Sequence, residues 1–218
     1  MPDLVTALPA APPLGWIALN ALLAALAVAI ASWLRPWRCV AVQGPPWPWG
    51  MAWLAVLLPW AGLPLGGLLR PISGIALLVL MAGWPLAVLA MAAAALLAAL
   101  SAAQPWAEAL QRLVWIGIVP ATCVLGIGAA VRRWLPLHLF AYILGRGYVG
   151  TLLASLVAGA VLWAAQPSAP GVSGSDLVVA NLLLATGEAG VCGTLLAILV
   201  VLRPQWLATY AERLYRAP

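Results

Sequence analysis

Most of the chain consists of apolar stretches long enough to cross a lipid bilayer. A helix that spans the roughly 30 Å hydrocarbon core needs about 20 apolar residues, and several such stretches follow one another with short polar segments between them. Of the 218 residues, 66% are hydrophobic and only 7% are charged, whereas soluble domains have roughly 25% charged residues. So few charges cannot cover a water-exposed surface. The sequence therefore predicts an all-α integral membrane protein and excludes a soluble enzyme.

Residues 1–218 are predicted to form a single transmembrane domain, a bundle of about seven helices. Proline, glycine and arginine residues mark the ends of the predicted spans. The apolar region 72–103 would be about 48 Å long as one helix, too long for an ordinary crossing. Gly83-Trp84-Pro85 lies inside this region, so we divide it there. The first part is short enough to be re-entrant, and six spans remain an alternative. The predicted spans are about 14–34, 51–69, 72–84, 85–102, 110–131, 138–165 and 177–202.

The arginine residues indicate the orientation, because cytoplasmic loops carry an excess of basic residues. With seven spans and the N-terminus outside, Arg70 and Arg112 lie outside. The cytoplasmic arginines are then Arg35, Arg38, Arg132, Arg133, Arg203, Arg213 and Arg216. With six spans, the last five of these would move outside. We therefore expect the N-terminus outside and the C-terminus in the cytoplasm. The arginines lie at span ends and form no basic patch, so no nucleic-acid partner is expected.

The residues before the first span contain Asp3 and no basic residue. A secretory signal peptide begins with a positively charged region, so we expect this span to be retained in the mature protein.

Two ionisable residues lie within predicted spans, where a charge is expensive and therefore a functional hypothesis. Glu188 lies near the middle of the last span, and Arg146 lies in the span before it. We predict that they form an intramembrane charge pair, since pairing would neutralise both. A structural bridge between the two helices is the favoured interpretation, ahead of a direct transport role. Gly187, Gly190 and Gly193 predict a close-packed face on the last helix.

The residues predict no metal site, no cofactor and no catalytic group. The one histidine, His138, begins a predicted span, and a capping or structural role is expected because a single imidazole does not make a transition-metal site. The three cysteines lie far apart without CxxC spacing, so they are interpreted as small apolar residues. Nucleotide-binding, hydrolase and metalloprotease motifs are absent from the sequence. We therefore expect that the chain is not an enzyme.

Four segments of the C-terminal half carry a family resemblance. They are LPLHLFAYI at 135–143, GYVG at 147–150, LATGEA at 184–189 followed by Gly193, and VVLRPQWLATY at 200–210. The chain resembles CbiM-type permeases, the substrate-specific membrane components of energy-coupling factor (ECF) transporters for cobalt and nickel, and especially their short proteobacterial branch. The resemblance covers about residues 111–215 and is weaker over 74–86.

The resemblance implies a helical fold of about seven spans in the bacterial inner membrane. It also implies membrane lipid, a transmembrane coupling protein and cytoplasmic ATPase subunits as partners. The predicted function is therefore that of a CbiM-like permease component in transition-metal uptake, with cobalt or nickel as substrate. The alternative is a degenerate, non-metal-binding scaffold or accessory subunit that kept the fold.

The usual metal-binding histidines of the family are missing. Family members bind the metal with the terminal amine, a histidine in second place and a histidine in the central region. Here the second residue is Pro2, and the aligned central segment 71–74 contains no histidine. His138 matches a family position outside this metal cage.

Overall fold

The computed structural model describes residues 13–38, 72–100, 105–134, 138–165 and 173–210, and these residues form helices and no strand. The all-α prediction is confirmed for this part of the chain. The predicted span 51–69 lies outside the described residues.

Four helices of the described residues are long and apolar enough to cross a membrane. The first covers Leu14–Arg38 and contains α1 (Leu14–Trp33). The second, Trp106–Trp134, joins α6 (Trp106–Arg112), the π-helical segment η2 (Leu113–Ile118) and α7 (Val119–Trp134). The third joins the π-helical segment η3 (Ala141–Val149) to α8 (Gly150–Ala165), and the fourth is α9 (Gly174–Leu202). These helices indicate a membrane protein.

Two shorter helices occupy the long apolar region that the sequence divides at Gly83. They are α4 (Ile75–Ala82) and α5 (Trp84–Leu100), so Trp84 begins the second helix instead of ending the first. Gly83 has a φ of 84°, a conformation that side chains disfavour. Pro85 follows in the first turn of α5, where a missing N–H costs no hydrogen bond. The chain therefore turns sharply between the two helices.

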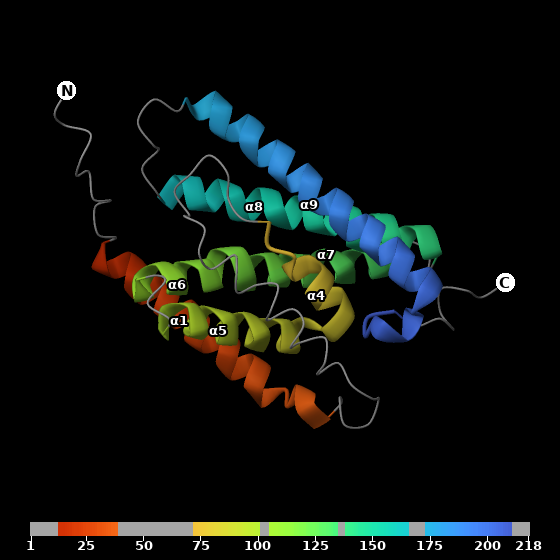
Figure 1. Cartoon of the computed structure of the whole chain (residues 1–218), viewed down its shortest axis with the longest axis horizontal. Coiled ribbons are helices and arrows are strands. Elements are labelled where there is room, and N and C mark those ends of the chain that lie inside the picture. Colours follow the sequence, from red (N-terminus) through yellow and green to blue (C-terminus); the bar gives the residue numbers. More distant parts are fainter. Residues whose placement is uncertain (1–12, 39–71, 101–104, 135–137, 166–172, 211–218) are drawn as a thin grey trace.

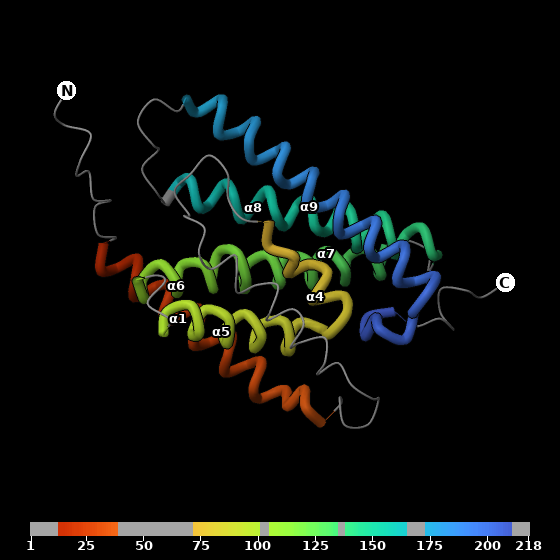
Figure 2. The backbone as a smooth tube through the Cα atoms, viewed as in Figure 1, coloured from red at the N-terminus to blue at the C-terminus, as the bar shows by residue number. Residues whose placement is uncertain are grey.

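The helices α5, α7 and α8 run roughly along the long axis of the bundle, whereas α1, beside α5, and α9, beside α8, cross it obliquely (Figure 1). Along the chain, α7 packs on α8 and α8 packs on α9 (Figure 2). The short helix α4 begins in the middle of the bundle and contacts α5, α7 and α9. Its residues from Ile75 to Met81 are all buried. Because α4 has only 8 residues, it is about 12 Å long and covers less than half of a membrane core.

Candidate functional site

The carboxylate of Glu188 lies at the N-terminal end of α4. Glu188 is 4% exposed. Its Oε1 accepts hydrogen bonds from the Ser73 amide at 3.0 Å, the Ser73 hydroxyl at 2.6 Å and the Gly74 amide at 3.2 Å. Its Oε2 accepts a hydrogen bond from the Ser155 hydroxyl of α8 at 2.6 Å. The carboxylate therefore joins three helices, α4, α8 and α9, inside the bundle.

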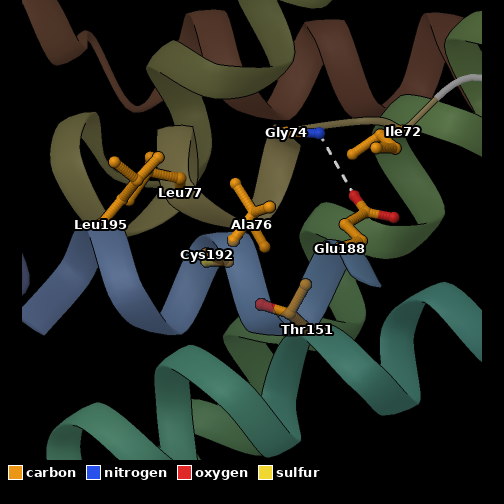
Figure 3. A pocket seen from close by; sticks show the side chains of 9 residues that line it. Ile72, Gly74, Ala76, Leu77, Thr151, Glu188, Cys192 and Leu195 are labelled. Atoms are coloured by element: carbon orange, nitrogen blue, oxygen red, sulfur yellow. Dashed lines mark hydrogen bonds between the residues drawn. The ribbon is translucent and has the colours of Figure 1, made fainter. Parts of the chain in front are cut away.

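This geometry stabilises a negative charge without a cation. The first amide groups of a helix lack partners within the helix and carry a partial positive charge. Glu188 accepts from the amide of Gly74, the N-cap residue with a φ of 60°, and from the amide of Ser73 directly before it. Hydrogen bonds to an ionised acceptor are roughly twice as strong as neutral ones. Glu188 therefore holds the start of α4 against α9. Figure 3 shows the hydrogen bond from the Gly74 amide to the Glu188 carboxylate.

Arg146 is buried in η3 and has different partners. Its Nη1 donates a long hydrogen bond of 3.4 Å to the Thr209 carbonyl, and its guanidinium carbon lies 5.5 Å from the centre of the Tyr142 ring. Gly128 of α7 makes room for it, since a Cβ there would lie 2.7 Å from Nε. That Nε has no hydrogen-bond partner among the described residues.

The predicted pair between Glu188 and Arg146 does not form, so this prediction is wrong. The ion pair that the described residues do form is between Arg112 and Glu108, with a distance of 2.7 Å. The prediction failed because it considered only an opposite charge as the partner of each buried charge. In the structure this helix end lies inside the bundle, and its amides compensate the carboxylate.

The two buried charges act on opposite ends of α4. Glu188 binds the N-terminal end directly. Arg146 reaches the C-terminal end through Thr209, whose amide and hydroxyl both donate to the Leu80 carbonyl, at 3.3 and 2.8 Å. A helix dipole favours an anion at its N-terminus and a cation at its C-terminus. The positions of both charges match the dipole of this short helix.

Of the three glycines predicted on the close-packed face, only Gly193 lies in a contact. A Cβ at Gly193 would lie 3.5 Å from the Tyr148 Cβ, whereas at Gly187 and Gly190 it would meet no described atom within 4 Å. Within the part of the chain that the structure describes, Gly187 and Gly190 therefore make no close helix contact. Successive residues of a helix are separated by about 100°, and turning Glu188 inward directs these two glycines away from the neighbouring helices.

The close approaches to α9 come instead from glycines on η3 and α8. A Cβ at Gly147 would lie 2.6 Å from Cδ2 of Leu196, and a Cβ at Gly159 would overlap the Asn181 side chain.

His138 is exposed at the start of the helix that contains η3. Its Nδ1 accepts a hydrogen bond from the Phe140 amide at 3.3 Å, and the two rings are stacked with centres 5.6 Å apart. Its carbonyl also accepts from the Tyr142 amide at 3.0 Å. A side chain that accepts from the first turn has the geometry of an N-cap.

A small cavity of about 40 Å³ lies beside the Glu188 carboxylate. Figure 3 shows it between α4, α8 and α9, lined by Ile72, Gly74, Ala76, Leu77, Thr151, Glu188, Val191, Cys192 and Leu195. The Thr151 hydroxyl donates to the Gly147 carbonyl. A cavity of this size has room for about one to a few water molecules, but its lining is almost entirely apolar and offers few of the polar partners that water needs. The part of the chain that the structure describes contains no group of three or more His, Cys, Asp or Glu residues arranged to hold a metal ion.

Sequence reasoning missed Ser73, Ser155 and Thr209 as partners of the two buried charges. A serine and a glycine directly before an apolar run are a signal for the start of a helix, and this signal could have placed Ser73 and Gly74 at the N-terminus of α4. Ser155 is buried in the largely apolar helix α8, where a hydroxyl needs a partner. The chain matches no protein-family model, no curated protein and no solved structure.

Proposed function

We propose that this chain is a CbiM-like permease component of an ECF transporter and takes part in the uptake of cobalt or nickel. The observation that carries the proposal is the buried carboxylate of Glu188 at the start of a short helix inside a bundle of apolar helices. Ionisable residues at membrane depth mark transport paths in many membrane proteins, and transporters build their sites from interrupted helices. Glu188 also belongs to the LATGEA segment that carries the family resemblance.

The proposal requires partner subunits. The sequence has no nucleotide-binding motif, so ATP hydrolysis would come from cytoplasmic ATPases, through a transmembrane coupling protein in the bacterial inner membrane. The long helices present large apolar side chains on their outer faces, among them Leu22, Leu26, Leu153, Leu183 and Val201. Such faces suit lipid or the helices of a coupling protein.

A second function is a membrane scaffold or accessory subunit that kept the fold but does not bind metal. The specific observation that favours it is the complete engagement of Glu188, whose carboxylate accepts four hydrogen bonds from the protein itself. A carboxylate held in this way acts as a structural link between helices.

Uptake of radioactive cobalt or nickel distinguishes the two functions. Cells that express the chain together with the coupling protein and ATPases of an ECF transporter are compared with cells lacking only this chain, and with cells whose ATPase is inactive. We expect accumulation that requires both the chain and the active ATPase. Co-purification with the partners but equal accumulation without the chain would favour the scaffold. If the chain neither co-purifies with the partners nor supports uptake, the proposal is refuted.

A further inference from the structure

The segment Arg203–Tyr210, called the strap below, turns back from the end of α9 and lies against α4 (Figure 1). It begins with the 3-10 turn η4 (Pro204–Trp206), which reverses the chain direction. Leu207 and Tyr210 of the strap are 2% and 8% exposed. Both belong to the same apolar core as α4. The strap is therefore an integral part of the bundle.

The strap supplies donors to the last turn of α4. The Ala208 amide donates to the Met81 carbonyl at 2.9 Å, and the Thr209 amide and hydroxyl donate to the Leu80 carbonyl at 3.3 and 2.8 Å. The last carbonyls of a helix have no partner within the helix. Because α4 ends at Gly83 inside the protein, these carbonyls are buried and need a donor from outside the helix.

Thr209 also joins the strap to η3. Its hydroxyl is hydrogen-bonded to the Tyr142 hydroxyl at 2.9 Å, and its carbonyl accepts from Arg146 at 3.4 Å. The Tyr142 and Tyr210 rings lie next to each other, with centres 5.1 Å apart. One residue thus connects the end of α4 to a neighbouring helix.

We propose that the strap is a positioning device that fixes α4, and that it couples the C-terminal end of the chain to the Glu188 site. The helix α4 has only 8 residues and is fixed at both ends, by Glu188 and by the strap. A rigid helix this short moves as one body, so releasing its C-terminal end shifts its N-terminal end as well. Thr209 is the positioning residue, and it acts on Ser73 and Gly74 through α4. The coupling does not depend on whether the chain takes part in metal uptake.

Hydrogen exchange measured by mass spectrometry on the full chain in lipid nanodiscs tests this coupling. Thr209→Val removes the hydroxyl, whereas Thr209→Ser keeps it. In Thr209→Val we expect the amides of residues 73–82 to exchange about fivefold faster, the factor expected for the loss of the one hydrogen bond from this hydroxyl to α4. Thr209→Ser should exchange like the wild type. Thr186→Val is the control, since the exposed Thr186 donates its hydroxyl within α9, to the Leu182 carbonyl.

Faster exchange confined to residues 203–210, with the amides of Ser73 and Gly74 unchanged, would overturn the proposal. Equal acceleration of α4 by Thr186→Val would overturn it too, because the effect would then be general. If Thr209→Val does not fold, Tyr142→Phe provides the same test, since it removes the hydroxyl bonded to Thr209 and leaves the bonds to Leu80. We expect a smaller acceleration of α4 in that variant, and no acceleration would count against the coupling.

Discussion

Glu188 and Arg146 show how single charges are accommodated in an apolar interior. An uncompensated buried charge costs several kcal/mol. The Glu188 charge is compensated by hydroxyls and helix amides, and the Arg146 charge by an aromatic ring and a carbonyl. Each charge is therefore compensated without an ion pair to the other. The presence of costly groups could be predicted from the sequence, but their partners could not, because serine and threonine residues at membrane depth give no periodic signal.

Glu188→Gln should lower the free energy of unfolding by about 1.5–3 kcal/mol, since it weakens hydrogen bonds to a charged group. Combined with Arg146→Gln, the loss should be larger than for Glu188→Gln alone, because the two side chains share no direct contact that the second change could relieve. Combined with Ser73→Ala, the two losses should not add, because Ser73 donates directly to the carboxylate. Denaturant unfolding in detergent micelles measures all these variants. Recovery of stability on adding Arg146→Gln would mean that the charges are paired after all.

Gly159→Ala and Gly187→Ala form a matched pair of substitutions. A Cβ at Gly159 would overlap Asn181, so we expect a loss of about 1–3 kcal/mol from overpacking. Gly187 is exposed in α9 with open space around it, and Gly187→Ala should be neutral or stabilising by up to about 1 kcal/mol. Thermal unfolding of the two variants checks this difference. The reverse order of stability would show that α9 packs through the opposite face.

At the scale of elements, long apolar helices were the most predictable feature, because length and composition alone specify a helix that crosses a bilayer. The break at Gly83 was also predictable, from a glycine directly before Trp-Pro in a region too long for one span. The depth at which α4 starts was not, since nothing local in the sequence distinguishes a helix that begins inside the bundle. The π-helical segments η2 and η3 likewise follow from tertiary contacts that one sequence does not reveal.

Gly83→Ala tests the turn between α4 and α5. Gly83 has a φ of 84° and a ψ of 161°, a region occupied almost only by glycine. The nearest atom to an added Cβ is Cδ of Pro85 at 3.9 Å, so the cost comes from the backbone. We expect a loss of about 1–3 kcal/mol. Gly15→Ala in the regular helix α1, where nothing lies within 4 Å, is the control and should not destabilise. Equal stability of both variants in thermal unfolding would contradict the strained turn.

At the scale of the whole molecule, the orientation of the bundle stays a prediction from the arginine distribution. Ser173 lies directly before α9, and residue 217 lies after it. We expect these two positions on opposite sides of the membrane, with residue 217 in the cytoplasm. Ser173→Cys and Ala217→Cys, in a background without the native cysteines, can be labelled with a membrane-impermeant thiol reagent on intact cells. Labelling of both positions from the same side would rule out the seven-span arrangement.

We propose that the chain is a permease component without the metal cage of CbiM-type permeases, so that metal uptake depends on the assembled transporter. Equilibrium dialysis of the purified, tag-free chain against Co²⁺ or Ni²⁺ tests this claim most directly, because a polyhistidine tag would itself bind these metals. The chain has one histidine, His138, which is exposed at a helix end, and transition-metal sites usually need three or four ligands. We predict a Kd no tighter than roughly millimolar, as expected for one imidazole and scattered carboxylates. A stoichiometric site of micromolar or tighter affinity would contradict the account and would show that other residues form a metal cage.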